Sequence, residues 1–267
     1  MNNEELAKYY LIHKHEFYGE GGQQLLVQKL KKLINSTIEN NILAIDVGSN
    51  VGDYVENIVD ICKNKNLQIL CFEPNPVNIE IFKQRITHKN VTLYETCLSN
   101  TNGKAKLYNW MNSKNNNPGN ELAGLQGHGT EICDIEKYRL DFIIERDYND
   151  YKKIKFIKID TEGHDYNIIM GMGELLYKTE YIIFECSNCL DDCRGPGLEY
   201  PMKTLVDYLD GYNFDVYRIG RKKLFKVNGE YWHDIYETNK FWSNCFAIKK
   251  EDKLIEKIIN INTFDYV

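Results

Sequence analysis

The chain has 267 residues, of which 43% are hydrophobic and 27% charged, the composition of a globular protein and not of a disordered one. Its 33 basic and 39 acidic residues give a net charge of −6, which argues against nucleic acid as a partner because phosphate neutralisation supplies most of that affinity. No apolar run is as long as a membrane span, and eight cysteines without a signal-peptide pattern favour a cytoplasmic protein with reduced thiols.

Short apolar runs alternate with helical patterns along most of the chain. Two helices are expected first, at Glu4–His15 and Gln23–Asn35, with Gly19, Gly21 and Gly22 breaking between them. The strands expected after them are Leu43–Val47, Gln68–Phe72, Val91–Glu95, Lys155–Asp160 and Tyr181–Cys186. The helices expected between these strands are Asp53–Cys62, Pro76–Ile86, Ile135–Arg146 and His164–Tyr177. This alternation predicts crossover units and an α/β fold with a mainly parallel sheet.

Three later segments complete the pattern. Residues 109–129 are crowded with Asn and Gly and lack periodicity, which is typical of a functional loop. A helix is expected at Met202–Leu209, and strands at Phe214–Ile219 and Cys245–Lys249. Because no repeat or linker interrupts the chain, we expect one domain.

The first expected strand runs into a glycine turn that opens a helix. The turn reads Asp46-Val-Gly48-Ser49-Asn50-Val-Gly52. In α/β sheets such a turn receives a nucleotide-bearing cofactor, because glycine lets the backbone approach the ligand and the helix amino terminus offers free N–H groups. The glycine spacing is not G-x-G-x-x-G, so a nicotinamide cofactor is disfavoured. A plain tight turn is the alternative.

Two more acidic sites follow strands. Glu73 ends the second strand, where such folds place a carboxylate that binds ribose hydroxyls. The alternative is a solvated or capping Glu ahead of Pro74. The fourth strand ends in Asp160-Thr-Glu162-Gly-His164-Asp165, which places four ionisable side chains within six residues at the edge where open α/β sheets bind ligands.

These motifs resemble the FkbM family of S-adenosylmethionine-dependent methyltransferases over about residues 40–190. The specific part is Lys158-Ile-Asp160-Thr-Glu162-Gly-His164-Asp165, in which Asp165 replaces the family's last Glu. The resemblance implies a Rossmann-like class I methyltransferase fold, a mainly parallel seven-stranded sheet with helices on both faces and an antiparallel last strand. We expect the chain to consist of a helical extension at 1–40, a methyltransferase domain at 41–250 and a tail at 251–267.

The resemblance also implies a binding site for S-adenosylmethionine. Its methionine moiety would lie against the Asp46–Gly52 turn, its ribose against Glu73 and its adenine against Thr96, Cys97 and Leu98, with Asp160 near the reactive methyl group. The cofactor-binding residues expected are Asp46, Gly48, Ser49, Asn50, Gly52, Glu73, Pro74, Cys97, Leu98 and Asp160.

The expected chemistry is alignment of donor and acceptor together with removal of a proton. A site lined by carboxylates favours a cationic donor. An alcohol acceptor must lose its proton, and Asp160, Glu162, His164 or His128 could accept it. His164 is preferred because histidine titrates near neutrality.

The resemblance carried by these motifs implies transfer of a methyl group from S-adenosylmethionine to a hydroxyl, and we expect that hydroxyl to belong to a sugar or glycan. The alternatives are a methyltransferase acting on a protein or other small molecule, and a non-catalytic module that binds a nucleoside on the same fold. No metal is expected, because Cys186, Cys189 and Cys193 would need a distant fourth ligand for zinc. The oligomeric state is open.

Overall fold

The computed structural model describes residues 1–17, 21–34, 40–62, 66–109, 123–125, 130–185, 201–239 and 241–267. These residues form two compact units. Residues 37–180 make up one, here called the central unit, and residues 1–36 with 181–267 make up the other, the terminal unit. None of the helices in these ranges combines the length and apolar character needed to cross a membrane. The domain boundaries expected at residues 40 and 250 stay a prediction.

The central unit alternates strands and helices, as crossover connections between parallel strands require. Its elements are β1 (Asn40–Val47), α3 (Val55–Ile61), β2 (Asn66–Phe72), α4 (Pro76–Arg85), β3 (Val91–Tyr94), β4 (Cys97–Leu98), β5 (Gly103–Asn109), β6 (Ala123–Gly124), β7 (Thr130–Tyr138), α5 (Leu140–Asp147), β8 (Lys153–Ile159), α6 (Asp165–Met170), α7 (Leu175–Lys178) and the start of β9 (Thr179–Glu185).

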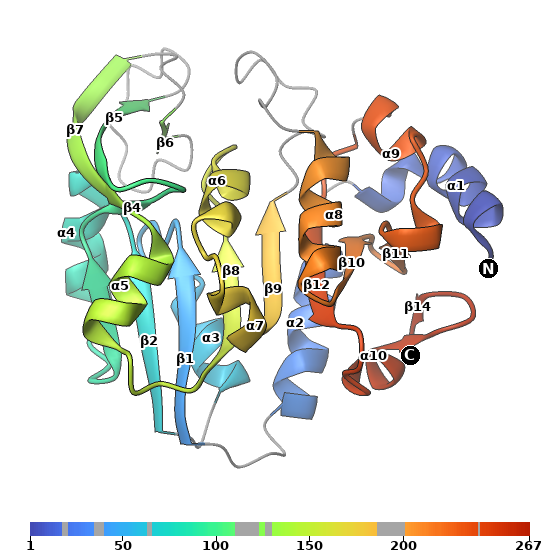
Figure 1. Cartoon of the computed structure of the whole chain (residues 1–267), viewed down its shortest axis with the longest axis horizontal. Helices are drawn as coiled ribbons and strands as arrows, with labels where there is room; N and C mark the ends of the chain where they lie inside the picture. The colour runs from blue at the N-terminus through green and yellow to red at the C-terminus, as the bar shows by residue number, and fades with distance from the viewer. Residues whose placement is uncertain are drawn as a thin grey trace. The chain divides into compact units, whose positions relative to one another are not determined.

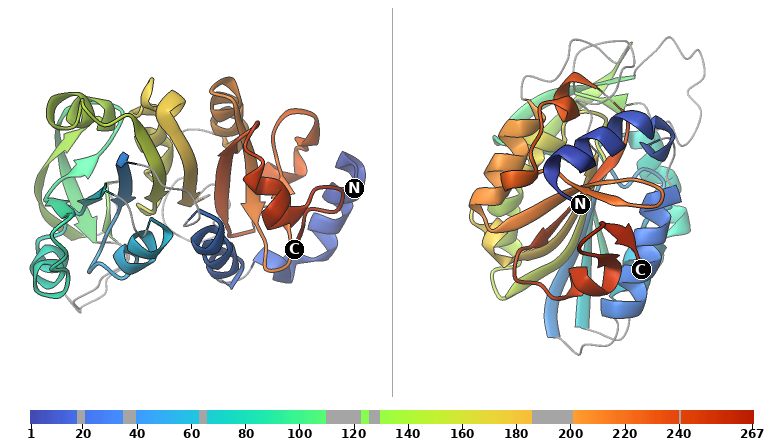
Figure 2. Two further views of the ribbon diagram at one scale, coloured as in Figure 1. Left: turned by 90° about the horizontal axis from the view of Figure 1, so that it is seen from below. Right: turned by 90° about the vertical axis from the view of Figure 1, so that its right-hand side faces the viewer.

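The main sheet of the central unit has the strand order β3-β2-β1-β8, with all neighbours parallel. Figures 1 and 2 show α5, α6 and α7 on one face of these strands and α3 and α4 on the other. Strands covered on both faces read as continuous apolar runs, which explains why β1 and β2 were recognisable in the sequence. The expected α/β fold with a parallel sheet is confirmed.

At the start of α4, the Asn75 side chain caps the helix by accepting a hydrogen bond from the backbone N–H of Val77, beside Pro76.

A second sheet, with the order β4-β7-β5-β6, lies near the carboxyl ends of the main strands (Figure 1). Cys97, Leu107 and Ile135 form its small hydrophobic core. The helix expected over Ile135–Arg146 was therefore wrong in its first half, because residues 130–138 form β7 and α5 begins only at Leu140. Pairing of β7 with β5 over its whole length overrides the local helical pattern.

The terminal unit combines chain segments that are far apart in sequence. Its antiparallel sheet has the order β9-β12-β10-β11. The elements are α1 (Asn3–Ile12), η1 (Lys14–Phe17), α2 (Gly21–Ile34), α8 (Met202–Gly211), β10 (Phe214–Ile219), β11 (Leu224–Lys226), η3 (Gly229–Tyr231), α9 (Ile235–Thr238), β12 (Asn244–Lys249), α10 (Leu254–Ile258), β13 (Ile259–Asn260) and β14 (Asp265–Tyr266).

Three sequence expectations need correction. Gly21 and Gly22 do not break between helices but form the first turn of α2, where a Cβ on Gly22 would lie 2.1 Å from the carbonyl oxygen of Gly220. The single helix expected over His164–Tyr177 is two short helices, α6 and α7, separated by a turn at residues 171–174. The expected count of seven sheet strands is not confirmed. The strand order of the central unit contains four strands, and that of the terminal unit contains another four.

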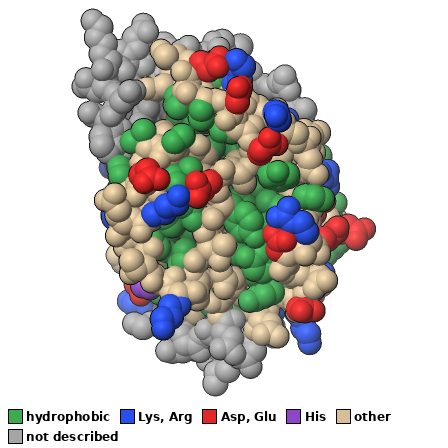
Figure 3. All heavy atoms as spheres, turned by 90° about the vertical axis from the view of Figure 1, so that its left-hand side faces the viewer, with side chains coloured by type: hydrophobic (Ala, Val, Ile, Leu, Met, Phe, Trp, Pro, Cys, Tyr) green, Lys and Arg blue, Asp and Glu red, His purple; other side chains and the backbone are tan. Residues whose placement is uncertain are grey.

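Acidic and basic side chains are mixed on the surface. The face drawn in Figure 3 carries Lys and Arg side chains close to Asp and Glu side chains, with hydrophobic side chains between them. Ion pairs of the central unit include Lys83–Glu95 and Lys106–Glu131, both at 2.8 Å. Such exposed pairs contribute at most about 1 kcal/mol each to stability.

Candidate active site

The carboxyl ends of β1, β2 and β8 bring the predicted motifs together. Asp46 on β1 lies opposite Lys158 on β8 in parallel register, so the two side chains share a face of the sheet. After β1, the backbone N–H groups of Gly48 and Ser49 both donate to the carbonyl of Phe72, each at 3.0 Å. The Ser49 hydroxyl donates back to the carbonyl of Asp46 at 2.8 Å. These bonds fix the turn against the end of β2.

Gly48 and Gly52 are both required by the shape of this turn. Their φ angles of +73° and +88° lie in the left-handed region. A Cβ on Gly48 would lie 1.9 Å from the carbonyl oxygen of Asp160, and one on Gly52 would lie 2.6 Å from Ile86 Cγ1. Each glycine thus allows another part of the protein to pack closely against the turn. This is a reason for glycine in addition to the one expected from the sequence, which was the close approach of a ligand.

Glu73 is buried at the end of β2 and holds two backbone segments. Its Oε2 accepts from the backbone N–H of Asn50 at 2.8 Å, and its Oε1 accepts from that of Asn75 at 2.9 Å. The Asn78 side-chain amide lies 3.4 Å from the same Oε1. Burial raises the pKa of Glu73, against the hydrogen bonds from Asn75 and Asn50. Glu73 therefore links the glycine turn to the start of α4 through hydrogen bonds. Pro74 lies between Glu73 and that helix.

Further hydrogen-bond acceptors belong to the two asparagines that contact the Glu73 carboxylate. The side-chain oxygens of Asn50 and Asn78 are buried, and within the described residues neither accepts a hydrogen bond. A carboxylate oxygen has two lone pairs, so Glu73 keeps accepting capacity beyond its backbone bonds. Buried acceptors normally find donors. This set of acceptors is therefore suited to a ligand that offers hydroxyl groups, as the ribose of a nucleoside does.

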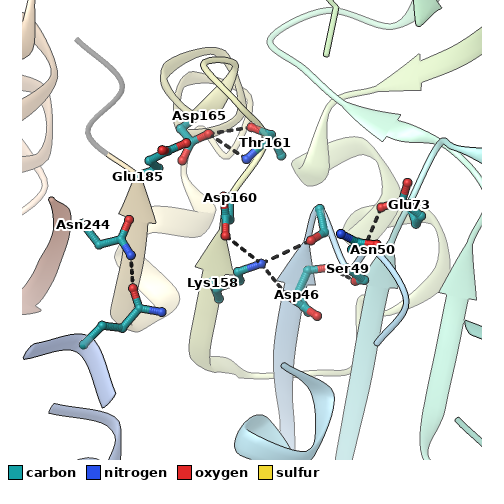
Figure 4. Close-up of polar contacts among 12 residues, drawn as sticks. Asp46, Ser49, Asn50, Glu73, Lys158, Asp160, Thr161, Asp165, Glu185 and Asn244 are labelled. Carbon is teal, nitrogen blue, oxygen red and sulfur yellow. Dashed lines mark hydrogen bonds and ion pairs between the residues drawn. The ribbon is translucent and has the colours of Figure 1, made fainter. Parts of the chain in front are cut away.

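Asp46, Lys158 and Asp160 form a charged triad at the ends of β1 and β8 (Figure 4). Lys158 Nζ lies 3.5 Å from Asp46 Oδ1, 3.4 Å from Asp160 Oδ2 and 3.2 Å from the carbonyl oxygen of Gly48. The side chain of Asp46 is fully buried and that of Lys158 is 8% exposed, whereas that of Asp160 is 41% exposed. Asp160 is thus the member that faces solvent.

The triad is electrostatically coupled. Burial alone would lower the pKa of Lys158, but the carboxylates of Asp160 and Asp46 raise it above its usual value. Burial also raises the pKa of Asp46, and Lys158 opposes that shift. Lys158 is therefore charged and offsets part of the negative charge that the two carboxylates can carry. The acidic character expected for the site is therefore reduced by an internal cation.

The loop after β8 is held by its own side chains. Asp165 is buried, and its Oδ1 accepts from the backbone N–H of Thr161 at 3.1 Å and from the Thr161 hydroxyl at 2.6 Å. Glu162 and Gly163, between them, adopt left-handed φ angles of +55° and +97°. Asp165 thus stabilises the loop that presents Asp160 and Glu162.

His164 does not have the titration behaviour expected for it. Its Nε2 lies 3.1 Å from Ser99 Oγ, and its Nδ1 lies 3.3 Å from the Asn167 side-chain amide. Burial, with a contribution from Lys137, lowers its pKa to about 4. The expectation that this imidazole titrates near neutrality is wrong, because the residue is partly buried and both ring nitrogens contact polar side chains.

Cys97 and Leu98 belong to the second sheet, and Thr96 immediately precedes them. Cys97 and Leu98 form β4 and pair with Lys137 and Tyr138 of β7. The Thr96 hydroxyl donates to the carbonyl of Glu136. Cys97 and Leu98 are buried, and Ser99 follows them, so the hydrogen bond to His164 links this strand to α6.

Lys158 is the member of the site whose role the sequence analysis missed. It interrupts the apolar run Phe156-Ile157-Lys158-Ile159 of a strand that is buried along its length. A lysine in a buried strand requires a charged partner, and this was the available signal. His128, Cys186, Cys189 and Cys193 lie outside the described residues.

A model of the family described as the methyltransferase FkbM domain matches residues 46–195, more than half of the chain. The chain belongs to this family. The match begins at Asp46 and includes the glycine turn, Glu73, the triad and the loop that follows β8. The resemblance to FkbM methyltransferases seen in the sequence is therefore confirmed. A comparison with the curated proteins gives no match.

Several solved structures are similar to this FkbM chain. The methyltransferase FkbM from Methylobacillus flagellatus is 11% identical, with a TM-score of 0.46 over 92% of this chain and 57% of that chain. The precorrin-6y C5,15-methyltransferase from Geobacter metallireducens is 13% identical, with a TM-score of 0.40 over 85% and 88%. A SAM-dependent methyltransferase from Aquifex aeolicus is 9% identical, with a TM-score of 0.39 over 93% and 97%. The chain thus spans less than two thirds of the Methylobacillus protein.

Proposed function

We propose that this FkbM-family methyltransferase transfers a methyl group from S-adenosylmethionine to a hydroxyl group, with a sugar or glycan as the acceptor class. The observation that carries the proposal is the convergence, within the family match, of the glycine turn, the buried Glu73 and the part-exposed Asp160 at one sheet edge. Open α/β sheets bind their ligands at this edge.

The hydrogen-bond acceptors around Glu73 support S-adenosylmethionine as the methyl donor. Glu73, with the side-chain oxygens of Asn50 and Asn78 beside it, would accept hydrogen bonds from the two ribose hydroxyls. Asp46 and the glycine turn would hold the methionine moiety, and Cys97 with Leu98 would border the adenine. When bound, S-adenosylmethionine supplies a methyl group activated by a sulfonium. An acidic site attracts that cation more strongly than it attracts a neutral thioether.

Asp160 is the residue we assign to the acceptor's proton. Its side chain is 41% exposed and sits at the end of β8, whereas His164 is partly buried with a pKa of about 4. A carboxylate within hydrogen-bond reach of a hydroxyl can orient it and accept its proton at Oδ1 or Oδ2. Lys158 Nζ lies 3.4 Å from Oδ2 and so helps to fix the position of this carboxylate at the end of β8.

Calorimetric titration with S-adenosylhomocysteine tests the proposal, with NAD as the competing dinucleotide. We expect micromolar binding of S-adenosylhomocysteine and none of NAD. Glu73→Ala should weaken that binding by roughly 1–3 kcal/mol, the cost of leaving ribose hydroxyls and buried amides without their acceptor. Glu80→Ala is the matched control, because it removes an exposed carboxylate of α4 that lies outside the site.

The unfolding of each variant in urea must be recorded alongside, since Glu73 also braces the glycine turn. Unchanged affinity in a folded Glu73→Ala variant would remove Glu73 from the donor site. A folded wild-type protein that binds no S-adenosylhomocysteine would overturn the proposal and favour a non-catalytic module. Labelled donor with a panel of glycans would then test the acceptor class.

A further inference from the structure

Lys158 has three acceptor groups around one ammonium. Asp46 lies at 3.5 Å, Asp160 at 3.4 Å and the Gly48 carbonyl at 3.2 Å, and the Tyr54 ring lies 5.4 Å from Nζ. The ammonium donates a hydrogen bond to the Gly48 carbonyl oxygen, and the two carboxylates are its ion-pair partners. The arrangement connects the glycine turn, β1 and the end of β8 through a single cation.

Without that cation, the two carboxylates would be difficult to keep ionised. Asp46 is fully buried, and burial disfavours the charged form of a carboxylate. Asp160 lies within reach of the same ammonium and adds a second negative charge. Two such carboxylates without a counter-ion bind a proton at a pH where separate ones do not.

We propose that Lys158 is a positioning residue that holds Asp46 and Asp160 around one ammonium and opposes protonation of this pair, so that the site keeps negative charge for a cationic donor. The part that concerns the donor rests on the proposed function. The part that concerns the carboxylates depends only on the triad itself. The two parts can therefore fail separately.

Other titratable groups also face the triad. Cys71 on β2 lies opposite Asp46, Glu73 follows β2, and Tyr54 lies ahead of α3; each interacts electrostatically with Lys158. Burial, followed by the charge of Asp46, raises the pKa of Cys71 far above its usual range. Removing Lys158 also removes its interaction with these three groups. Lys158→Met and its double variant both lack Lys158, so the difference between these two isolates the contribution of Asp46.

The test is urea unfolding of the ligand-free protein between pH 5 and 8. In Lys158→Met, the folded state should hold a proton that the unfolded state has released, so stability should fall as pH rises through this window. The unfolding constant should then rise up to tenfold per pH unit more steeply than in the wild type. In Lys158→Met/Asp46→Asn, one carboxylate is gone and the additional pH dependence should disappear.

Lys155→Met is the matched control. Lys155 is also a buried lysine of β8, but its carboxylate partner is Glu180 at 2.5 Å, which also pairs with Lys153. Removing Lys155 deletes a buried charge without leaving Asp46 uncompensated. Its unfolding should keep the pH dependence of the wild type.

Each outcome decides the proposal. A pH dependence in Lys158→Met equal to that of Lys155→Met would overturn it. If Lys158→Met does not fold, folding of the double variant supports the proposal, and failure of both variants overturns it.

Titration with S-adenosylhomocysteine is the second readout: the dissociation constant of Lys158→Met should depend on pH between 6 and 8, and that of the wild type should not. Absence of binding by the wild type would contradict the proposed function and leave the unfolding test valid.

Discussion

At the scale of single residues, burial determines what His164 can do. The sequence places this histidine among three carboxylates and suggests a base that titrates near neutrality. In the structure its two ring nitrogens contact Ser99 and Asn167, and its pKa falls to about 4. His164 is therefore a neutral link between α6 and the loop after β4.

His164→Gln tests this role through the pH dependence of stability. The unfolded imidazole binds a proton near pH 6.5 and the folded one near pH 4, so the unfolded state gains protons first as pH falls. Wild-type stability should therefore drop by roughly 1–3 kcal/mol more than that of the variant between pH 6.5 and 4.5. Urea unfolding at several pH values measures the difference. Parallel curves for the two proteins would show that His164 is exposed and titrates normally.

At the scale of elements, the glycine turn depends on the strand beside it. The Gly48 position has a left-handed φ and lies against the backbone of Asp160, which cannot move without disturbing β8. Gly52 also has a left-handed φ, but it faces the side chain of Ile86, which can adopt another rotamer. The two glycines therefore differ in how much an added methyl group should cost.

Gly48→Ala should destabilise the protein by at least about 2 kcal/mol, from backbone strain together with the clash at Asp160. Gly52→Ala should cost less. Gly211→Ala at the end of α8 is the control: no atom lies within 4 Å of its Cβ position, and a helical alanine is favoured over glycine by up to about 1 kcal/mol. Urea unfolding of the three variants gives the order. A Gly48→Ala protein as stable as the wild type would mean that the turn moves freely away from β8.

The elements that could be predicted are those whose patterns are local. Strands β1, β2 and β8 are apolar runs that end in the motif residues, and the Asn75-Pro76 pair marks the start of α4. The second sheet could not be found in this way, because β7 is stabilised by pairing with β5, some 30 residues earlier in the chain. The partner of Asp46 was missed for a related reason, since only the register of β1 with β8 places Lys158 beside it.

At the scale of the whole molecule, charge bears on the class of acceptor. The chain carries a net charge of −6, and the ion pairs of the central unit place acidic side chains beside basic ones. A protein that binds nucleic acid without sequence preference needs a basic surface to displace counterions from phosphates. The mixed charges drawn in Figure 3 do not form such a surface on that face.

We therefore expect no measurable affinity for nucleic acid. Fluorescence anisotropy of a labelled single-stranded RNA and a labelled duplex DNA at 50 mM salt should show no binding up to about 50 μM protein, since non-specific binders reach dissociation constants of about 1–100 μM even at physiological salt. Repeating the titration at 200 mM salt separates phosphate binding from other contacts. A dissociation constant below about 10 μM that weakens with salt would contradict this expectation, and labelled donor would then show whether the bound nucleic acid is methylated. In that case Glu73 and Asp160 would keep the roles proposed for them, because the donor site does not depend on which hydroxyl is methylated.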